Sequence, residues 1–465
     1  MRKIDLAALI HALHGELLNK GEEVCPAGVC TDSREDVQGK VFFALTGERF
    51  DGHDYILDVL RRGALAVVAD ARAFHAHRDR EAIIGFAKEN ARTLFAAEDS
   101  RRALGDAAAA ALALWKVPVI AVTGSSGKTT TRNILYTLLC EKYAVRNGIK
   151  NYNNDIGVPL TIFSLEEGDE LLLLEMGMNH AGELLRLAEI TRPKIVLINN
   201  IGTAHIENLG SRDAIAAAKK ESLQYFNEHS TAVLYARDSF FDFLAAGVPG
   251  EIIPFGDLPE GFEIIRDRGI DGYVLGCGGR EADFALGGAH NLANLSAAAA
   301  AAYKLGLAKS VIAERIPLIR PVESRSQVVD GKIRIINDCY NANPESMRAG
   351  LSLLASVRGS RRIAVLADML ELGGDSTCLH GELGSWLSAG RVCDELVAVG
   401  PAMAECARRA LDGGFDAAAT HTFPSCDEVK PWLAGFVREG DTVFLKGSHG
   451  MHLEEVLPVI RQFAR

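Results

Sequence analysis

The stretch VTGSSGKTT at residues 122–130 decides the fold of this chain. It follows a β-rich run at residues 117–122 and leads into a helix, so successive backbone N–H groups and a helix N-terminus surround an anion. Glycine is needed where the backbone turns and approaches a phosphate closely. Lys128 is expected to reach the β- and γ-phosphates of a nucleotide, and Thr129 to offer its hydroxyl to Mg²⁺. The residues predicted to bind the phosphates are Gly124, Ser125, Ser126, Gly127, Lys128, Thr129 and Thr130.

The loop departs from the strict phosphate-binding pattern at one position. GxxxxGK[ST] requires glycine where this chain has Val122. A glycine turn with an incidental lysine is the alternative interpretation. The strand before the loop and the helix after it favour the phosphate-binding one.

Length and composition bound the class of protein. A chain of 465 residues exceeds what one hydrophobic core usually covers, which predicts about three domains. Hydrophobic residues make up 48% and charged residues 24%, the usage of a globular protein. The net charge is −11 and no long Lys/Arg cluster is present, so nucleic acid is not expected as a partner.

The sequence also predicts a cytoplasmic protein that does not insert into membranes. No run of about 18 apolar residues exists, and the first 18 residues are interpreted as an amphipathic helix rather than a signal peptide. Nine cysteines are scattered without a CxxC pair, which is typical of cytosolic thiols and not of a zinc site. The chain is expected to act as a monomer.

Secondary-structure patterns predict an α/β fold class with three domains. A small α/β N-terminal domain spans residues 1–98, a central P-loop domain with a parallel sheet spans 99–320, and a C-terminal Rossmann-like domain spans 321–465. The predicted strands are at 41–45, 64–69, 117–122, 171–174, 195–199, 333–336, 363–366, 396–399 and 442–445. The predicted helices of the central domain are at 102–115, 212–226 and 292–305.

Polar side chains follow the strands that neighbour the glycine loop. Glu175 ends the strand at 171–174, and strand carboxyl ends line the ligand crevice of an α/β sheet, so Glu175 falls where a phosphate-bound metal would lie. His205 follows the next strand and is either a second metal ligand or a hydrogen-bonded loop histidine. Lys219, on a predicted helix, is by default a solvated cation.

A third polar group lies in the C-terminal domain. The stretch NDCYNANP at residues 337–344 follows a predicted strand and carries five hydrogen-bonding side chains, Asp338 and Asn343 among them. Polar loops at strand ends are common, so a surface loop and a binding site remain equally open on this evidence.

Together these stretches resemble the Mur ligase family over essentially the whole chain. In family order they are TDSR at 31–34, GERFDGHDY at 47–55, TGSSGKTT at 123–130, NYNNDIGVPLT at 151–161, EMGMNHAGEL at 175–184, NIGTAHIENLGS at 200–211, AKKE at 218–221, GAHNLANLSAA at 288–298, NDCYNANPESM at 337–347, ADMLELG at 367–373 and KGSHGM at 446–451. The YNANP form resembles the dipeptide-adding member. The missing first glycine, at Val122, also resembles the family form of the loop.

The resemblance implies an ATP-dependent, amide-forming ligase of peptidoglycan synthesis. Its small-molecule substrates would be UDP-N-acetylmuramoyl-tripeptide (UDP-MurNAc-tripeptide) and D-alanyl-D-alanine, joined through an acyl phosphate to give UDP-MurNAc-pentapeptide, ADP and phosphate. Whether the third residue of the tripeptide is lysine or diaminopimelate stays open. Because ATP contacts would come from two domains, the C-terminal domain is expected to close on ligand binding.

The resemblance also implies roles for individual residues. Thr129 and Glu175 would hold one Mg²⁺, and His205 and Lys219 a second, with Lys219 carbamylated by CO₂ so that it offers oxygen ligands. The implied catalytic residues are Lys128, Glu175, His205 and Lys219. The implied nucleotide contacts outside the loop are Asn291, Asn294, Arg325, Asp338 and Asn343, and the implied UDP-sugar contacts are Ser33, Arg34, Gly47, Asp51, Asn153 and Asn154.

Two departures and three rivals accompany this reading. Ser324 stands where the family usually has glycine, and His449 stands where KGSRG is common. The rivals are a sister Mur ligase, a folylpolyglutamate synthase and a nucleotide-binding switch. YNANP disfavours the sister enzymes, and the separate TDSR-containing first domain disfavours the other two.

Overall fold

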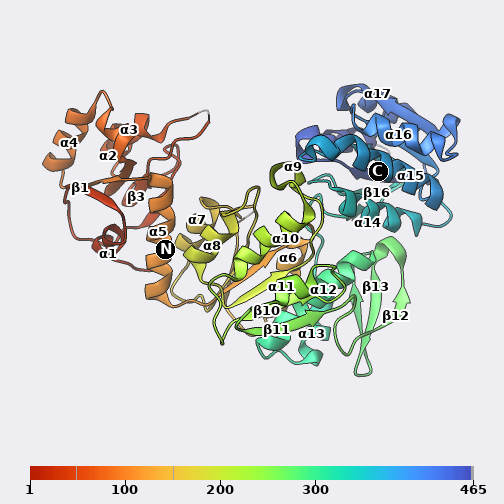
Figure 1. The fold of residues 1–465 in the computed structure, drawn as a ribbon, viewed down its shortest axis with the longest axis horizontal. Coiled ribbons are helices and arrows are strands. Elements are labelled where there is room, and N and C mark those ends of the chain that lie inside the picture. The colour runs from red at the N-terminus through yellow and green to blue at the C-terminus, as the bar shows by residue number, and fades with distance from the viewer. Residues whose placement is uncertain (49, 150, 462–465) are drawn as a thin grey trace.

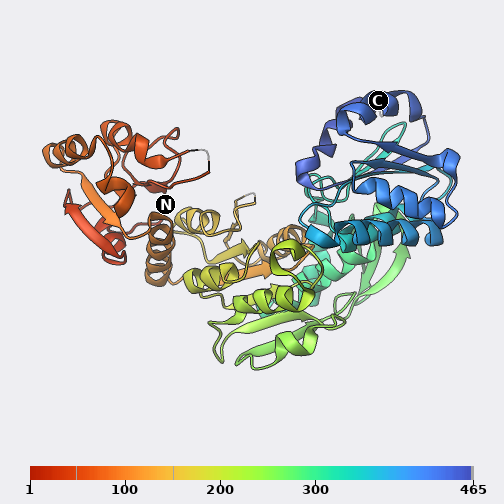
Figure 2. The same cartoon turned by 45° about the horizontal axis from the view of Figure 1, so that its top comes forward.

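A computed structural model describes residues 1–48, 50–149 and 151–461, and its three domains lie in a row (Figures 1 and 2). The N-terminal domain lies at one end of the molecule. Helix α5 (Ser100–Trp115) lies between this domain and the central one, and the C-terminal domain lies over the far end of the central domain. The α/β class and three-domain fold predicted from the sequence are confirmed. The boundaries at 98 and 320 stay predictions.

The N-terminal domain is built on a five-stranded sheet in the order β1-β5-β4-β3-β2, in which only β1 runs antiparallel. Its strands are β1 (Gly15–Asn19), β2 (Gly28–Cys30), β3 (Lys40–Phe43), β4 (Ala66–Asp70) and β5 (Thr93–Ala97). Its helices are α1 (Leu6–His11), η1 (Gly52–Tyr55), α2 (Ile56–Arg61), α3 (Ala71–His75) and α4 (Arg80–Glu89).

The helix predicted over the first 18 residues is wrong beyond His11. Gly15 has φ +150°, and the chain from there pairs with β5 as a strand. Edge pairing with a buried strand outweighs the local helical pattern, which sequence periodicity does not report.

The central domain is a doubly wound sheet of six parallel strands in the order β11-β10-β9-β6-β8-β7. The strands are β6 (Val119–Thr123), β7 (Val145–Asn147), β8 (Leu171–Glu175), β9 (Ile195–Ile198), β10 (Thr231–Tyr235) and β11 (Glu251–Phe255). The further helices are α6 (Lys128–Leu139), α7 (Gly157–Phe163), α8 (Glu183–Thr191), α9 (Ile206–Leu209), α10 (Arg212–Lys220), α11 (Phe241–Ala245), α12 (Ala289–Lys304) and α13 (Lys309–Arg315). The helix predicted at 212–226 therefore ends as an α-helix at Lys220 and continues as a 3₁₀ turn, Glu221–Leu223.

Hydrophobic side chains alternate between the two faces of this sheet. Val119 and Ala121 belong to a core that contains α5 and α8, whereas Ile120 and Val122 belong to a core that contains α6 and α12. The first of these cores also contains Phe43 and other residues of the N-terminal sheet. The two domains on either side of α5 thus share one continuous core.

A small antiparallel sheet, absent from the sequence-based prediction, lies beside the central sheet. Its strands are β12 (Glu263–Asp267), β13 (Tyr273–Cys277) and β14 (Arg280–Phe284). All of β12 is exposed and only β13 is buried throughout. The exposed strand lacks the apolar alternation that predicts a half-buried strand.

The C-terminal domain has six strands in the order β15-β16-β20-β17-β18-β19, with only β15 antiparallel. They are β15 (Gln327–Val329), β16 (Arg334–Asn337), β17 (Arg362–Ala367), β18 (Glu395–Val399), β19 (Thr420–Phe423) and β20 (Thr442–Lys446). Its helices are α14 (Pro344–Ala355), α15 (Ser376–Gly390), α16 (Met403–Asp412), α17 (Cys426–Phe436) and α18 (Leu457–Arg461). Its two cores are formed by residues of this domain, except for Ile270.

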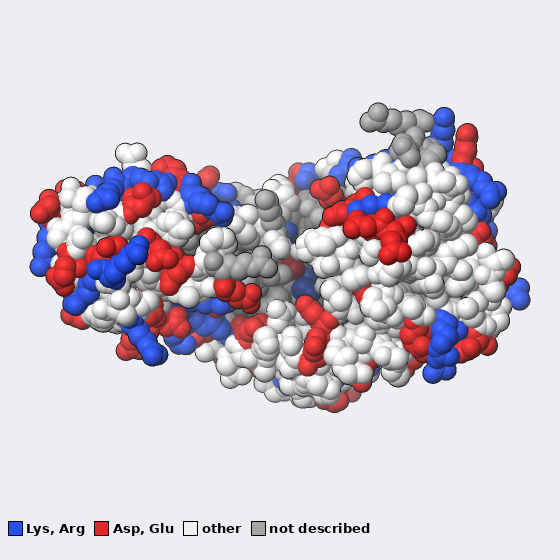
Figure 3. Space-filling model, turned by 90° about the horizontal axis from the view of Figure 1, so that it is seen from above, with Lys and Arg blue, Asp and Glu red and all other residues white. Residues whose placement is uncertain are grey.

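The surface carries mixed charge. On the face shown in Figure 3, basic side chains lie among acidic ones over all three domains. All nine cysteines are free thiols. Within residues 1–48, 50–149 and 151–461, every helix is too short or too polar to span a membrane.

Candidate active site

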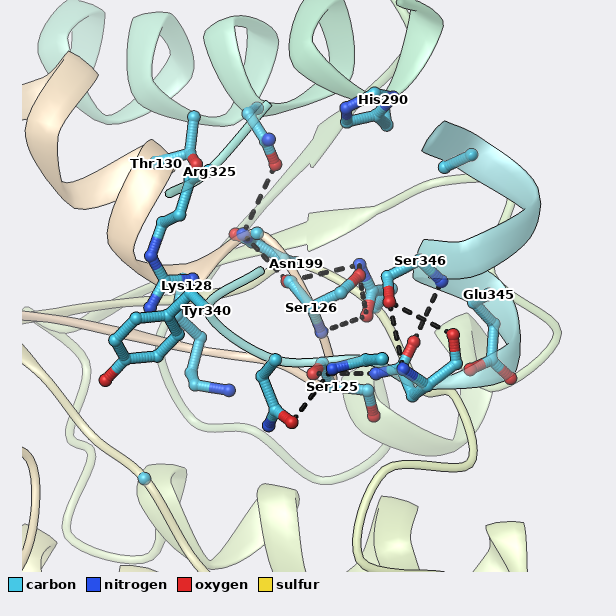
Figure 4. A pocket seen from close by; sticks show the side chains of 18 of the residues that line it. Ser125, Ser126, Lys128, Thr130, Asn199, His290, Arg325, Tyr340, Glu345 and Ser346 are labelled. Atoms are coloured by element: carbon cyan, nitrogen blue, oxygen red, sulfur yellow. Dashed lines mark hydrogen bonds between the residues drawn. The ribbon is translucent and has the colours of Figure 1, made fainter. Parts of the chain in front are cut away.

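A cavity of about 700 Å³ lies where the carboxyl ends of the central strands meet the C-terminal domain (Figure 4). It brings together most of the predicted ATP and metal residues from both domains. The predicted residues that line it are Ser125, Ser126, Gly127, Lys128, Thr130, Asn153, Asn154, Glu175, His205, Asn291, Asn294, Arg325, Asp338 and Asn343. Ser33, Arg34, Gly47 and Asp51 lie in the N-terminal domain and do not line this cavity.

The phosphate loop joins β6 to α6, and two of its residues must be glycine. Gly124 has φ +145° and Gly127 has φ +78°. A Cβ on Gly127 would lie 2.4 Å from Asn294 Oδ1. Val122, where the strict motif has glycine, is a fully buried residue of β6 whose strand partner is Glu175. Its side chain fills the core, so this position does not shape the loop.

Lys128 and Glu175 form the charged centre of the loop. Lys128 Nζ donates to the Gly124 carbonyl at 2.9 Å, and burial lowers the pKa of Lys128 while Glu175 opposes that shift. Burial by itself would raise the pKa of Glu175, but Lys128 and a hydrogen bond from Thr129 hold that pKa below its usual value. The carboxylate is therefore ionised.

Thr129 and Glu175 fit a bound Mg²⁺. Thr129 Oγ1 donates to Glu175 Oε2 at 2.6 Å, and Asn153 Nδ2 donates to Glu175 Oε1 at 3.1 Å. Both candidate ligands are oxygen atoms, which Mg²⁺ prefers, and Mg²⁺ usually takes only one or two protein ligands beside substrate phosphates. Within the described residues, no group of three or more His, Cys, Asp or Glu side chains could hold a metal.

His205 lines the cavity, whereas Lys219 does not, and the two residues differ in their surroundings. His205 has φ +64°, and its Nδ1 lies 2.6 Å from Glu371 Oε2 of the C-terminal domain. This contact lacks hydrogen-bond geometry, and it is an ion pair only when the imidazole is protonated. Lys219 is 2% exposed, and burial together with repulsion from Lys128 places its pKa well below the usual value. Within the described chain, its amine has no hydrogen-bond or ion-pair partner.

The predicted nucleotide residues approach the loop from two domains. Asn294 Oδ1 accepts from Thr131 Oγ1 at 3.1 Å, and Asn294 Nδ2 donates to Asn291 Oδ1 at 3.2 Å, which ties α12 to α6. From the C-terminal domain, the Arg325 guanidinium stacks 3.9 Å from the centre of the Tyr340 ring (Figure 4). A planar cation on an aromatic ring gives a flat surface beside the loop.

Asp338 and Asn343 have structural partners in the C-terminal domain. Asp338 Oδ2 accepts from Lys446 Nζ at 2.5 Å, and its Oδ1 accepts from the Ser326 amide at 2.9 Å. Asn343 caps α14 by accepting from the Ser346 amide at 2.8 Å. Both residues line the cavity.

The TDSR loop of the N-terminal domain is held in one conformation. Arg34 binds both oxygens of Asp32, and this hydrogen bonding lowers the pKa of Asp32 to about 2. Arg62, at the end of α2, donates to the Ser33 carbonyl and to the Glu35 carbonyl, each at 2.5 Å. The Arg62 guanidinium therefore forms hydrogen bonds with the backbone on both sides of Arg34.

The remaining predicted UDP-sugar residues make local hydrogen bonds. Asp51 accepts from the His53 amide at 3.0 Å and contacts His53 Nδ1 at 2.5 Å, so its carboxylate fixes the start of η1. Asn154 accepts from the Gly157 amide at 2.8 Å and caps the turn before α7. Gly47 donates its amide to the Phe50 carbonyl at 2.8 Å. Arg49, within the same stretch, lies outside the described residues.

Comparisons with known proteins agree with this architecture. Residues 27–111 match the Mur ligase family catalytic domain, 122–302 the Mur ligase middle domain, and 324–449 the Mur ligase glutamate ligase domain. The UDP-N-acetylmuramoyl-tripeptide–D-alanyl-D-alanine ligase of Treponema pallidum is 32% identical over 95% of this chain and 97% of its own length. This chain belongs to the Mur ligase family.

Solved Mur ligase structures resemble the whole chain as well. MurF from Acinetobacter baumannii superposes with a TM-score of 0.85 at 28% identity, covering 99% of both chains. MurF from Thermotoga maritima, solved in complex with ADP, gives a TM-score of 0.77 at 28% identity and covers 96% of this chain and 98% of its own.

Sequence reasoning missed several residues that shape the site of this Mur ligase. Asn200 Oδ1 accepts from the Ser126 amide at 3.0 Å, and it could have been found because it follows a strand beside the loop, β9, which ends at Ile198. Glu371 and Glu345 contact the central domain from more than 140 residues away, and no local pattern reports such a contact. Arg62 looks like any solvated arginine at the end of a helix.

Proposed function

We propose that this Mur ligase joins D-alanyl-D-alanine to UDP-MurNAc-tripeptide with consumption of ATP, giving UDP-MurNAc-pentapeptide, ADP and phosphate in the cytoplasm. The observation that carries the proposal is the cavity itself. It sets a phosphate loop and an ionised Glu175 opposite the YNANP loop of the C-terminal domain. Full-length similarity to ligases of this name supports the choice of substrates.

The reaction follows from carboxylate activation. The terminal carboxylate of the tripeptide attacks the γ-phosphorus of ATP, the bond to the β-phosphate oxygen breaks, and an acyl phosphate and ADP result. The amine of D-alanyl-D-alanine then adds to the acyl carbon, phosphate leaves, and the amine loses a proton. Lys128 and the loop amides stabilise the charge on the phosphates, while the two-domain cavity keeps water from the acyl phosphate.

Metal ions complete the charge balance in this proposal. Thr129 and Glu175 would hold one Mg²⁺, and His205 with a carbamylated Lys219 a second; the ions neutralise repulsion between the carboxylate and the triphosphate. An uncharged lysine amine adds to CO₂, and the lowered pKa of the buried Lys219 supplies that form. His205 must then exchange its contact with Glu371 for a metal or share it.

Phosphate release tests the proposed function. A ligase should release phosphate only when ATP, UDP-MurNAc-tripeptide and D-alanyl-D-alanine are all present, and the product should gain the mass of the dipeptide. Lysine-containing and diaminopimelate-containing tripeptides, assayed side by side, identify the natural donor. Release that ignores both peptides would instead indicate a nucleotide switch.

Arg62→Ala is expected to weaken binding of the UDP-sugar substrate specifically. Loss of two hydrogen bonds to the TDSR loop should raise KM for UDP-MurNAc-tripeptide by about five- to tenfold. The expected rise is no larger because the Arg62 side chain is partly exposed to solvent, which weakens its contacts. KM for ATP and kcat should stay unchanged, as measured by coupled ADP release.

The matched control for this prediction is Arg61→Ala on the same helix. Arg61 is exposed, and no contact of its side chain is found within the described residues. An equal rise in KM for ATP, or an equal effect of Arg61→Ala, would contradict a specific role of Arg62.

A further inference from the structure

The segment 201–205, between β9 and α9, is held from two domains at once. Within the central domain, the Gly202 amide donates to Ser125 Oγ of the phosphate loop at 2.8 Å, and the Ile201 amide donates to Asp238 Oδ2 at 2.8 Å. From the C-terminal domain, Glu345 Oε1 accepts from the Thr203 amide at 3.0 Å. The segment that ends in His205 therefore has a fixed position relative to both domains.

Glu345 approaches this segment closely. The Thr203 hydroxyl lies 3.2 Å and 3.1 Å from the two carboxylate oxygens of Glu345. A Cβ on Gly202 would lie 2.8 Å from Glu345 Oε2, so glycine is what permits the approach. Every hydrogen bond of the Glu345 side chain within the described residues goes to Thr203. The carboxylate therefore faces the central domain and not its own helix.

The helix that carries Glu345 is itself fixed against the phosphate loop (Figure 4). Asn343 and Ser346 form a capping box at the start of α14, which sets the direction of its first turn. Asn343 Nδ2 lies 3.5 Å from the Ser125 carbonyl. The contacts thus close a ring that runs from Ser125 through Gly202 and Thr203 to Glu345 and back through Asn343.

We propose that Glu345 is a positioning residue for the ligation reaction. By accepting hydrogen bonds from Thr203, it fixes Ser125 in the phosphate loop and the segment that carries His205 when the C-terminal domain is docked. The inference rests on the proposed function for its kinetic effect. It acts through the hydrogen bonds, so an uncharged acceptor of the same shape should serve.

Three variants test the positioning role by kinetics. Glu345→Ala should lower kcat at least tenfold, with KM for UDP-MurNAc-tripeptide within twofold of the parent, because that substrate is expected to bind the N-terminal domain. Glu345→Gln should restore kcat to within threefold, because its amide oxygen still accepts from the Thr203 amide. Arg348→Ala is the matched control on α14, and it should match the parent. Among the described residues, Arg348 forms an ion pair only with Glu382 of the same domain.

Amide hydrogen exchange supplies a readout that needs no substrate. In Glu345→Ala, peptides covering residues 199–209 should exchange at least tenfold faster, while those covering β17 stay unchanged. Gly202→Ala disrupts the contact between Glu345 and residues 202–203 from the central domain. It should show the same faster exchange and the same lower kcat, and it keeps the test valid if Glu345→Ala folds poorly. Parent-like exchange and kcat in both variants would overturn the proposal, and so would a Glu345→Gln defect equal to that of alanine. If the variants show the expected change in amide exchange but the parent enzyme forms no ligation product, only the proposed function is refuted.

Discussion

Replacing Lys219 with alanine is expected to lower kcat by about 10²- to 10³-fold, the range found when one electrostatic stabiliser of a developing charge is removed. Lys219 is buried on α10, has no hydrogen-bond or ion-pair partner within the described chain, and is repelled by Lys128. A buried, unpaired ammonium is costly, so the amine is held uncharged. An uncharged amine adds CO₂ and loses a proton, and the resulting carbamate would offer oxygen ligands in place of a neutral amine.

The neighbouring lysine provides the control for this prediction. Lys220 donates to the carbonyls of Phe243 and Ala246 at 2.6 Å and 2.7 Å on the surface, and Lys220→Ala should keep kcat within about threefold. A short carboxylic acid should partly restore the activity of Lys219→Ala. In the parent enzyme, ¹³C-labelled bicarbonate should give a carbamate NMR signal that the variant lacks. A fully active Lys219→Ala would refute the carbamate hypothesis.

The second large effect is expected at Lys128. Lys128→Ala should lower kcat by about 10³-fold, because the side chain neutralises phosphate charge in a site from which water is excluded. In this variant the pKa of Glu175 should also be higher than in the parent. Lys128 is the largest favourable influence that keeps the pKa of Glu175 low, so without it burial raises that pKa. Protonation of Glu175 would then begin at a higher pH, and residual activity should be lost as the pH falls through that higher value.

Lys128→Arg separates the effect of charge from the effect of side-chain geometry, and Lys332→Ala is the control. Arginine keeps the positive charge but cannot fit where Lys128 Nζ reaches the Gly124 carbonyl, so it should be nearly as inactive as alanine. Lys332 is an exposed lysine of the C-terminal domain, and its removal should leave turnover unchanged. Turnover by Lys128→Arg close to that of the parent would mean that charge without position suffices.

Strand-end reasoning predicted the part of the site that a single sheet assembles. Val122 and Glu175 are partners on adjacent parallel strands, so the phosphate loop and the carboxylate must lie side by side once the strands are recognised. The α/β class followed from the same alternation of strands and helices. In contrast, His205 and Glu371 belong to different domains, and their contact depends on how those domains dock. Residue patterns along one strand or helix carry no information on docking, which is why Glu345 also went unrecognised.

Pairing with other strands explains two of the differences in secondary structure. The helical periodicity of the first 18 residues continues past His11, but the chain there completes the edge of a sheet. Strand β12 is exposed along its whole length, so its sequence shows no buried face. In both cases the partner strand decides the structure, and the partner is distant in sequence or hidden from the pattern.

The shared core around α5 couples two domains whose sheets are separate. Phe43 of the N-terminal sheet and Val119 of the central sheet belong to one continuous cluster, although the N-terminal domain also has a core of its own. The two cores of the C-terminal domain include one residue from outside it, Ile270. A large-to-small substitution on the buried face of α5 is therefore expected to destabilise the N-terminal and central domains together.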